Sequence, residues 1–198
     1  SVQPTLLRLG PRGAAPVQRA LWDGRTVTGV TTLWMDQGID TGDTILRLEV
    51  PISNDDNAGT LATRLAERGA PLLAESLTLA HEGQAPRHPQ DRARGSYAKK
   101  LRKSDGGVDW AAPAIAVWNH QRAVTPWPGA TTTLRGERLR LERTHVAAAV
   151  GSHGAPGTVL ETGPAGVEVA CGVGRLSIDR IKPEGRGLLE AADWARGA

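Results

Sequence analysis

Residues 35–43 read Met35-Asp36-Gln37-Gly38-Ile39-Asp40-Thr41-Gly42-Asp43, and they separate two segments that have the pattern of β-strands. The segment from Thr26 to Met35 is rich in Val and Thr, and the segment from Asp43 to Ile52 alternates apolar and polar residues. Three carboxylates and two glycines lie in the nine residues between them. Glycines let the backbone approach a ligand, and a carboxylate on such a loop can move a proton. The alternative is a glycine-rich hairpin with solvated acids.

Helices are predicted on both sides of these strands. Residues 12–22 predict a short helix, with Pro16 where a first helical turn tolerates it. Leucines recur at helical spacing from Thr60 to Gly83, with Asn57 or Thr60 as the cap and Pro71 as the position of a bend. Because one helix, two strands and another helix cover a sheet poorly, we expect exposed apolar strands.

The second half of the chain has the pattern of a separate small domain. Residues 113–124 predict a helix, and residues 188–194 predict a closing helix. Five short strands are predicted at residues 130–134, 139–147, 157–160, 167–170 and 176–181. Strands of this length and spacing favour a small barrel or sandwich. We therefore divide the chain into a first domain at 1–85, a linker at 86–108 and a second domain at 109–198.

Composition limits the class of protein. The chain has 198 residues, 39% hydrophobic and 23% charged, which is ordinary for a globular protein with room for two small domains. Its apolar runs fall short of the roughly 20 residues of a membrane span, and its first residues lack the pattern of a secretory signal. The single cysteine, Cys171, excludes an internal disulfide and is expected to be a buried thiol. We expect a cytoplasmic protein, and the scattered histidines predict no metal site.

Positive charge gathers in the middle of the chain. One acid, Asp91, stands among seven cations: Arg87, Arg92, Arg94, Lys99, Lys100, Arg102 and Lys103. Such a segment is typical of a surface that binds a polyanion, although a solvated linker has the same composition. Further on, four arginines alternate along predicted strands: Arg135, Arg138, Arg140 and Arg143. They fit a nucleic-acid surface and a solvent face equally well. Trp127, between two prolines, is expected to fill the core at the domain junction rather than to stack on a base.

The loop at 35–43 belongs to a longer pattern that resembles the folate-dependent formyltransferases. Its first part is Arg12-Gly13-Ala14-Ala15-Pro16-x-Gln18-x-Ala20-x-Trp22-x-Gly24, followed by Asp36-x-Gly38-Ile39-Asp40-Thr41-Gly42-Asp43. Later segments are similar to the linker and C-terminal domain of methionyl-tRNA formyltransferases: Ser96-Tyr97-Ala98-x-Lys100-Leu101-x-Lys103, Val108-Asp109-Trp110, Arg122-Ala123-x-Thr125-Pro126-Trp127-Pro128-Gly129-Ala130 and Ala155-Pro156-Gly157-Thr158-Val159-Leu160. The resemblance is collinear over nearly the whole chain.

The resemblance implies a fold and an activity. The fold would be an α/β remnant of a Rossmann-like formyltransferase domain followed by a small OB-like β-barrel. The activity would be transfer of a formyl group from 10-formyltetrahydrofolate to the amino group of methionine on initiator tRNA, in translation initiation, by a monomer without a metal. Because the first half of such a catalytic domain has no counterpart here, we expect an N-terminally truncated or frameshifted product.

The resemblance also assigns site residues. Such enzymes react through an Asn, a His and an Asp; Asp40 matches the Asp, whereas Ser1 and Gln3 stand at the Asn and His positions. Asp40 would orient its neighbour and hold a water that relays the proton. Neither Ser1 nor Gln3 titrates near neutral pH as imidazole does. The implied folate pocket comprises Thr5, Leu6, Leu7, Gly38, Ile39, Asp40, Thr41, Gly42 and Asp43. The implied tRNA contacts are Lys99, Lys100, Arg102 and Lys103.

Two other functions stay open. A non-catalytic RNA-binding module would explain why the linker and second domain match throughout while two of three reaction residues differ. A relative that formylates an amino sugar would share the folate loop. The linker and C-terminal domain favour the tRNA enzymes over the sugar enzymes.

Overall fold

The computed structural model describes residues 1–6, 12–90 and 96–197. The chain divides into two compact units, Ser1–Leu101 and Arg102–Ala198. This division falls inside the segment 86–108 that the sequence assigns to a linker.

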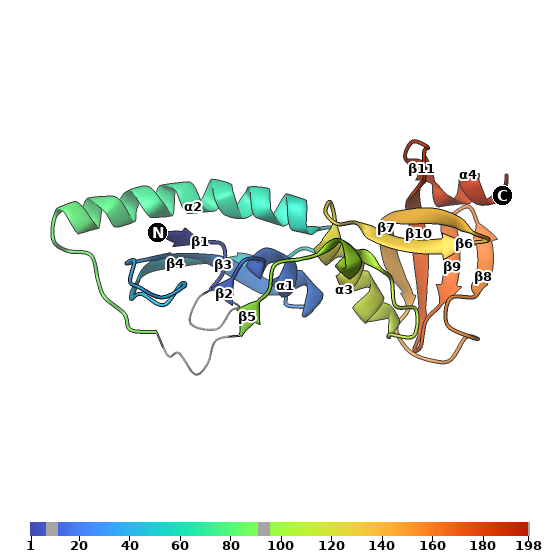
Figure 1. Ribbon diagram of the computed structural model, residues 1–198, viewed down its shortest axis with the longest axis horizontal. Helices are drawn as coiled ribbons and strands as arrows, with labels where there is room; N and C mark the ends of the chain where they lie inside the picture. Colours follow the sequence, from blue (N-terminus) through green and yellow to red (C-terminus); the bar gives the residue numbers. More distant parts are fainter. Residues whose placement is uncertain (7–11, 91–95, 198) are drawn as a thin grey trace. The chain divides into compact units, whose positions relative to one another are not determined.

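The N-terminal unit is built on a three-stranded antiparallel sheet. Its strands are β1 (Val2–Gln3), β3 (Val27–Leu33) and β4 (Thr44–Pro51), in the order β1-β3-β4 (Figure 1). Pairing of β3 with β4 confirms the two strands that alternation predicts on either side of residues 35–43. The loop with three acids therefore connects β3 to β4 at one end of this hairpin, and the pairing of the two strands fixes its register.

Strand β3 is buried on both faces. On one face, α2 (Ala58–His81) runs along the sheet (Figure 1), where Val30 packs against Gly69 and the Thr32 hydroxyl bonds the Ser76 hydroxyl at 2.7 Å. On the other face, the Thr31 hydroxyl donates to the Thr5 carbonyl at 2.7 Å. The expected exposure of apolar strands is therefore wrong for β3, because the residues after β1 fold back over the second face.

Both helices of this unit begin at residues that favour the start of a helix. α1 (Pro16–Trp22) has its proline in the first turn, where no amide hydrogen is needed. Asn57 caps α2 through bonds from the amides of Gly59 (2.9 Å) and Thr60 (3.0 Å), and the Thr60 hydroxyl accepts from the Asn57 amide at 3.0 Å. This reciprocal cap confirms the predicted start of α2. Pro71 lies inside the helix and does not end it.

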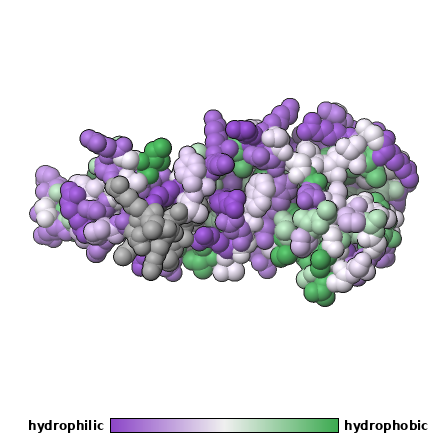
Figure 2. Space-filling model, turned by 60° about the horizontal axis from the view of Figure 1, so that its bottom comes forward, coloured by the Kyte–Doolittle hydropathy of each residue, from purple (hydrophilic) through white to green (hydrophobic). Residues whose placement is uncertain are grey.

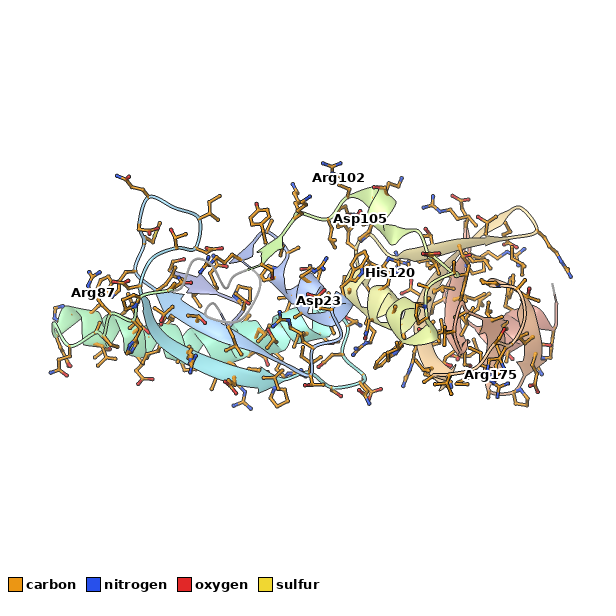
Figure 3. The ribbon with its side chains drawn as sticks, turned by 90° about the horizontal axis from the view of Figure 1, so that it is seen from below. Asp23, Arg87, Arg102, Asp105, His120 and Arg175 are labelled. Atoms are coloured by element: carbon orange, nitrogen blue, oxygen red, sulfur yellow. The ribbon has the colours of Figure 1, made fainter. Side chains whose placement is uncertain are left out.

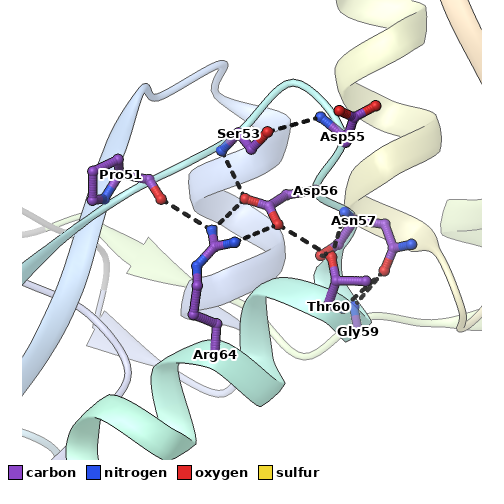
Figure 4. A network of polar contacts seen from close by, with 8 residues as sticks. All are labelled: Pro51, Ser53, Asp55, Asp56, Asn57, Gly59, Thr60 and Arg64. Atoms are coloured by element: carbon purple, nitrogen blue, oxygen red, sulfur yellow. Dashed lines mark hydrogen bonds and ion pairs between the residues drawn. The ribbon is translucent and has the colours of Figure 1, made fainter.

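A buried ion pair fastens the first turns of α2 to the end of β4 (Figure 4). The Arg64 Nη1 donates to Asp56 at 2.9 Å, the Ser53 amide donates to Asp56 at 2.7 Å, and Arg64 Nη2 donates to the Pro51 carbonyl at 3.0 Å. Burial alone would raise the pKa of Asp56, but the hydrogen bonds from Arg64 and Ser53 and the charge of Arg64 together lower it. The ionised carboxylate is the form that this network stabilises.

We expect Asp56→Asn to lower the free energy of unfolding by about 2 kcal/mol at neutral pH, because it removes charge-assisted bonds from a buried group. The native pKa is lowered, so the stabilisation is complete above the unfolded value of about 3.9 and is lost as the pH falls through the native one. Urea unfolding of both proteins from pH 7 to pH 3 measures this. A difference that persists unchanged at pH 3 would contradict the assignment.

A second, very small sheet joins distant parts of the N-terminal unit. β2 (Arg12–Gly13) pairs in parallel with β5 (Tyr97–Ala98), through bonds of 2.9 Å from the Arg12 amide to Ser96 and 3.0 Å from the Ala14 amide to Ala98. The sequence does not predict this pair. It brings the part of the basic segment directly before Lys99 beside the turn that precedes α1.

The C-terminal unit is a six-stranded antiparallel sheet with two helices. After the 3-10 turn η2 (Lys103–Gly106) and α3 (Ala114–Val124), the strands are β6 (Ala130–Leu134), β7 (Glu137–Ala148), β8 (Val159–Gly163), β9 (Gly166–Ala170), β10 (Arg175–Pro183) and β11 (Leu189–Glu190). All five predicted strands occur, in the order β6-β7-β10-β9-β8, with β11 on β10. No pairing between β6 and β8 closes the sheet in the described residues, so an OB-like closed barrel is not confirmed.

The core of this unit lies between α3 and the sheet. Ala114, Val117, Cys171 and Leu176 form a buried cluster, and the burial raises the pKa of the Cys171 thiol to about 11. Cys171 is thus the buried thiol that the sequence predicts. Around the core, Figure 2 shows a largely hydrophilic face, with green residues gathered on the C-terminal unit at the right.

Two expectations for the C-terminal unit need correction. Residues 188–194 are not one helix: Leu189 pairs with Ile181 in β11, and the helix α4 runs only over Ala191–Ala195. Strand pairing has replaced the first helical turn. Trp127 does not fill the core, because 55% of its surface is exposed. None of the helices in the described residues has the length and apolar character needed to cross a membrane.

Candidate functional site

Asp40 is the point at which three segments of the N-terminal unit meet. Its backbone has a φ of 56°, in the left-handed region, and its side chain is half-buried. The Gln3 Nε2 donates to Asp40 Oδ1 at 2.5 Å, and the Gly13 amide donates to Oδ2 at 3.2 Å. β1, the turn before α1 and the loop after β3 thus converge on one carboxylate, each oxygen of which accepts a hydrogen bond.

The loop around Asp40 is held by its own side chains. Asp36 accepts from the Gly38 amide at 3.0 Å and from the Thr41 hydroxyl at 2.7 Å, and the Trp34 amide donates to the Asp43 carbonyl at 2.9 Å. A Cβ on Gly38 would lie 2.0 Å from the Thr41 hydroxyl, and one on Gly42 would lie 1.8 Å from the Trp34 carbonyl. Both predicted site glycines are therefore required by packing within the loop.

Gln90 anchors the same loop from outside. Its Nε2 donates to the carbonyls of Asp40 (3.0 Å) and Gly42 (2.6 Å), and its Oε1 accepts from Arg12 Nη2 at 3.1 Å. Because Arg12 can only donate, it fixes which end of the Gln90 amide faces the loop. The sequence placed Gln90 in a linker and gave no signal for this role, since a single glutamine carries no pattern.

Asp43, at the far end of the loop, is close to a cation. Arg87 lies 3.6 Å from Asp43 and 4.4 Å from the centre of the Trp34 ring. The Trp34 indole in turn donates to the Pro86 carbonyl at 3.2 Å. Arg87 thus has a local partner on the loop.

The other predicted site residues lie in different surroundings. Gln3 contacts Asp40, whereas Ser1 is exposed and pairs through its backbone with Leu33. Thr5 is 1% exposed, so it lies in the core of the unit rather than on a pocket wall, and Leu6 packs against Gly29. Leu7 lies outside the described residues. Ile39 is 69% exposed at the tip of the loop.

The four lysines and arginines that the resemblance assigns to tRNA are exposed. Lys99 and Lys100 follow β5, and Arg102 and Lys103 begin η2, where Figure 3 shows Arg102 extending away from the ribbon. The Arg102 backbone amide donates to the Asp105 carboxylate at 2.6 Å, and the guanidinium takes no part in this bond. Among residues 1–6, 12–90 and 96–197, no acid forms an ion pair with these four side chains. Arg92 and Arg94 lie outside the described residues.

Two of the four alternating arginines of the C-terminal unit have acidic neighbours. Arg140 lies 2.5 Å from Glu142, and Arg143 lies 3.8 Å from Asp179, which also pairs with His145 at 2.8 Å. Burial raises the pKa of Asp179 in spite of the lowering effect of His145 and Arg143. Two of the four alternating arginines are thus neutralised, which favours a solvent face over a second nucleic-acid surface.

The site contains one group that can transfer a proton. Gln3 donates a hydrogen of its side-chain amide to Asp40. The Oε1 of Gln3 therefore remains as an acceptor, which can orient a bound amine but cannot take the proton of the amine. The side chain able to exchange a proton at this junction is the carboxyl of Asp40. Its two hydrogen-bond donors hold it in one orientation beside an exposed loop.

Comparison with sequence families identifies the chain. The profile "Formyl transferase" matches residues 4–77, and "Formyl transferase, C-terminal domain" matches residues 100–198. The chain belongs to the formyltransferase family. The predicted resemblance is confirmed. The N-terminal unit, with its helices and β-sheets, is part of a formyltransferase fold.

Relatives within the formyltransferase family carry a more specific name. The methionyl-tRNA formyltransferase of Geobacter sulfurreducens is 42% identical over 186 residues, which are 94% of this chain and 58% of the relative. That of Geotalea daltonii is 43% identical over 186 residues, with 94% and 59% covered. The chain thus spans less than two thirds of the length of these curated relatives.

Solved structures share the fold at low identity. A sugar 3N-formyl transferase, WlaRD, in the presence of dTDP and 5-N-formyl-THF, matches with a TM-score of 0.73 and 15% identity, over 94% of this chain and 65% of that one. HypX from Aquifex aeolicus in complex with tetrahydrofolic acid matches with a TM-score of 0.70 and 21% identity, over 98% and 34%. Both units of this chain therefore have counterparts in the folds of these solved structures.

Proposed function

We propose that this chain acts in the transfer of a formyl group from 10-formyltetrahydrofolate to the amino group of methionyl initiator tRNA. The observation that carries the proposal is the geometry of Asp40, held by Gln3 and Gly13 at an exposed loop, in a formyltransferase that is 42% identical to a methionyl-tRNA formyltransferase. Two solved structures of the same fold, one in complex with tetrahydrofolic acid and one in the presence of 5-N-formyl-THF, support a folate as the formyl donor. The reaction would belong to translation initiation in the cytoplasm.

The proposed chemistry uses Asp40 for the proton. In the reaction, the amino nitrogen bonds to the formyl carbon, the bond from that carbon to the folate nitrogen breaks, and a proton passes from the amine to the folate nitrogen. Asp40 takes the proton of the amine directly or through a water, and Gln3 orients the amine. Loop residues Gly38–Asp43 form one wall of the folate pocket, with Ile39 as its exposed apolar contact. Closing such a loop on the pterin would bury that side chain.

The proposed RNA contacts are Lys99, Lys100, Arg102 and Lys103. All four are exposed, and no acid in the described parts of the chain neutralises them. A cation that contacts a phosphate releases a counterion, so its contribution appears in the salt dependence of binding. The same proposal includes an OB-like barrel in the C-terminal unit that contributes to RNA binding.

We expect the double variant Lys99→Ala, Lys100→Ala to reduce the salt dependence of initiator tRNA binding. Each lost phosphate contact should lower the slope of log K against log salt by about 0.7 to 0.9. Filter binding between 50 and 300 mM KCl measures the slope. Arg143→Ala is the matched control, because Arg143 already pairs with Asp179, and its slope should equal that of the unchanged protein. Equal slopes for all three proteins would remove the lysines from the RNA contact.

One observation favours a second candidate function, a non-catalytic RNA-binding module. Gln3 and Ser1 occupy the positions of the family His and Asn, and neither titrates near neutral pH. The test is an assay of this chain with 10-formyltetrahydrofolate and methionyl initiator tRNA, run beside a tRNA-binding measurement. Formylmethionyl-tRNA as product supports the enzyme, whereas salt-sensitive binding without product supports the module. Transfer to an amino sugar nucleotide alone would instead support the sugar enzymes.

A further inference from the structure

An exposed aromatic ring covers the residue that holds Asp40. Tyr97, the only tyrosine of the chain, is 61% exposed on β5. Its ring takes the space where a side chain on Gly13 would begin: the ring Cε2 lies 2.7 Å from the ideal Cβ position of Gly13. The backbone of Arg12 pairs with Tyr97 in the parallel ladder of β2 and β5, which holds the backbone of Tyr97 beside Arg12 and Gly13.

Gly13 connects this ring to the candidate reaction centre. One side of the Gly13 backbone is covered by Tyr97, and its amide donates to Asp40 Oδ2 at 3.2 Å. Gly13 has a φ of 106°, which favours glycine, so the close approach of ring, backbone and carboxylate depends on the missing side chain. Tyr97 is thus separated from Asp40 by a single residue.

Positive charge follows the ring directly along the chain. Ala98 is 1% exposed and anchors β5, whereas Lys99 and Lys100 are both exposed. An exposed aromatic face followed by lysines is the arrangement that binds single-stranded nucleic acid, since a base stacks on the ring and phosphates contact the cations. Here it lies beside the carboxylate at which the amino group would react.

We propose that Tyr97 positions the acceptor by stacking on the unpaired base at the 3′ end of the RNA, the nucleoside that carries the amino acid. This rests on the proposed function and adds a residue to it. Lys99 and Lys100 contact the phosphates that precede this nucleoside. Stacking at Tyr97 brings the esterified amino acid to Asp40, because only Gly13 separates the ring from the carboxylate.

A purely structural role for Tyr97 makes a different prediction. If the ring only covered Gly13, its loss would weaken binding of every RNA to the same extent. If the ring stacks on the terminal base, loss of the ring should weaken the binding only of RNA that has that base. The coupling between ring and base therefore separates the two roles.

The experiment compares two forms of initiator tRNA, one ending in its 3′ adenosine and one with an abasic residue at that position. Binding of each is measured with the 198-residue chain and with Tyr97→Leu, which keeps an apolar cover over Gly13 but has no π face. For the unchanged protein, we expect loss of the base to weaken binding about tenfold. For Tyr97→Leu, the two RNAs should bind alike, with an unchanged salt slope. Tyr97→Phe should restore the tenfold difference.

Four results would overturn the inference. If Tyr97→Leu still distinguishes the two RNAs tenfold, the ring does not contact the base. If Trp127→Ala, which removes an exposed ring of the other unit, abolishes the difference instead, the stacking residue is Trp127. If the chain neither binds nor formylates initiator tRNA, the proposed function fails as well. Binding and transfer that are insensitive to Tyr97 would leave the proposed function intact and remove only this inference.

Discussion

Asp40→Asn is expected to lower the rate of formyl transfer to methionyl initiator tRNA by about a hundredfold to ten-thousandfold. The amide has nearly the same shape, but it cannot take the proton of the amine. It also presents an NH2 group to one of the two donors, Gln3 or Gly13, that now bond the carboxylate. Single-turnover formylation with saturating folate measures the chemical step.

The control for this variant is another acid of the N-terminal unit. Asp23→Asn removes a carboxylate that pairs on the surface of α1 with Arg19 at 2.9 Å, and the rate should be unchanged. Asp40→Asn should also retain its affinity for initiator tRNA, because the lysines that follow β5 are untouched. A rate for Asp40→Asn within about twofold of the unchanged protein would exclude Asp40 from proton transfer.

Gly42→Ala is expected to disrupt the loop and abolish folate binding. The new Cβ would lie 1.8 Å from the Trp34 carbonyl, so the backbone must move. That movement would break the bond from the Trp34 amide to Asp43 and the bond from Gln90 to the Gly42 carbonyl. Overpacking of this kind typically costs about 1 to 3 kcal/mol, and here it also releases Asp40. Urea unfolding and titration with 5-formyltetrahydrofolate measure the two effects.

The matched glycine for this test is Gly187. A Cβ there would meet nothing within 4 Å, so Gly187→Ala should change the free energy of unfolding by less than about 0.5 kcal/mol and leave folate binding unchanged. If Gly42→Ala bound 5-formyltetrahydrofolate as tightly as Gly187→Ala, the loop would not form a wall of the folate pocket.

Local patterns in the sequence predict most elements of this fold. Alternation finds β4 because one of its faces is more exposed than the other, and the Val- and Thr-rich composition finds β3, which is buried on both faces. Asn57 marks the start of α2 because its side chain satisfies free amides. Local patterns do not predict the pairing of residues that lie far apart in the sequence. The strands β2 and β5 have two residues each and lie far apart in sequence, and Leu189 joins β10 instead of a helix. Closure of the predicted barrel depends on β6 and β8, which no local pattern links.

The candidate site was predictable only in part. The acidic loop and Gly13 belong to the motifs that resemble formyltransferases, so Asp40 could be singled out and its neighbour Gln3 placed beside it. Gln90 could not, because a side chain that bonds two carbonyls leaves no pattern in sequence. Thr5 was placed on the pocket wall although it is buried beneath β3, since a motif gives the order of residues and not the face each one occupies.

Hydrogen exchange with and without 5-formyltetrahydrofolate tests most directly whether the Asp40 loop lines a formyl-folate pocket. Exchange of the amides in residues 36–43 would be followed by mass spectrometry in the unchanged chain and in Asp40→Asn. We expect the folate to slow exchange at Gly38–Asp43 and at Gly13, and to leave the sheet of the C-terminal unit unaffected. Folate binding that protects other segments and leaves residues 36–43 unchanged would contradict the assignment.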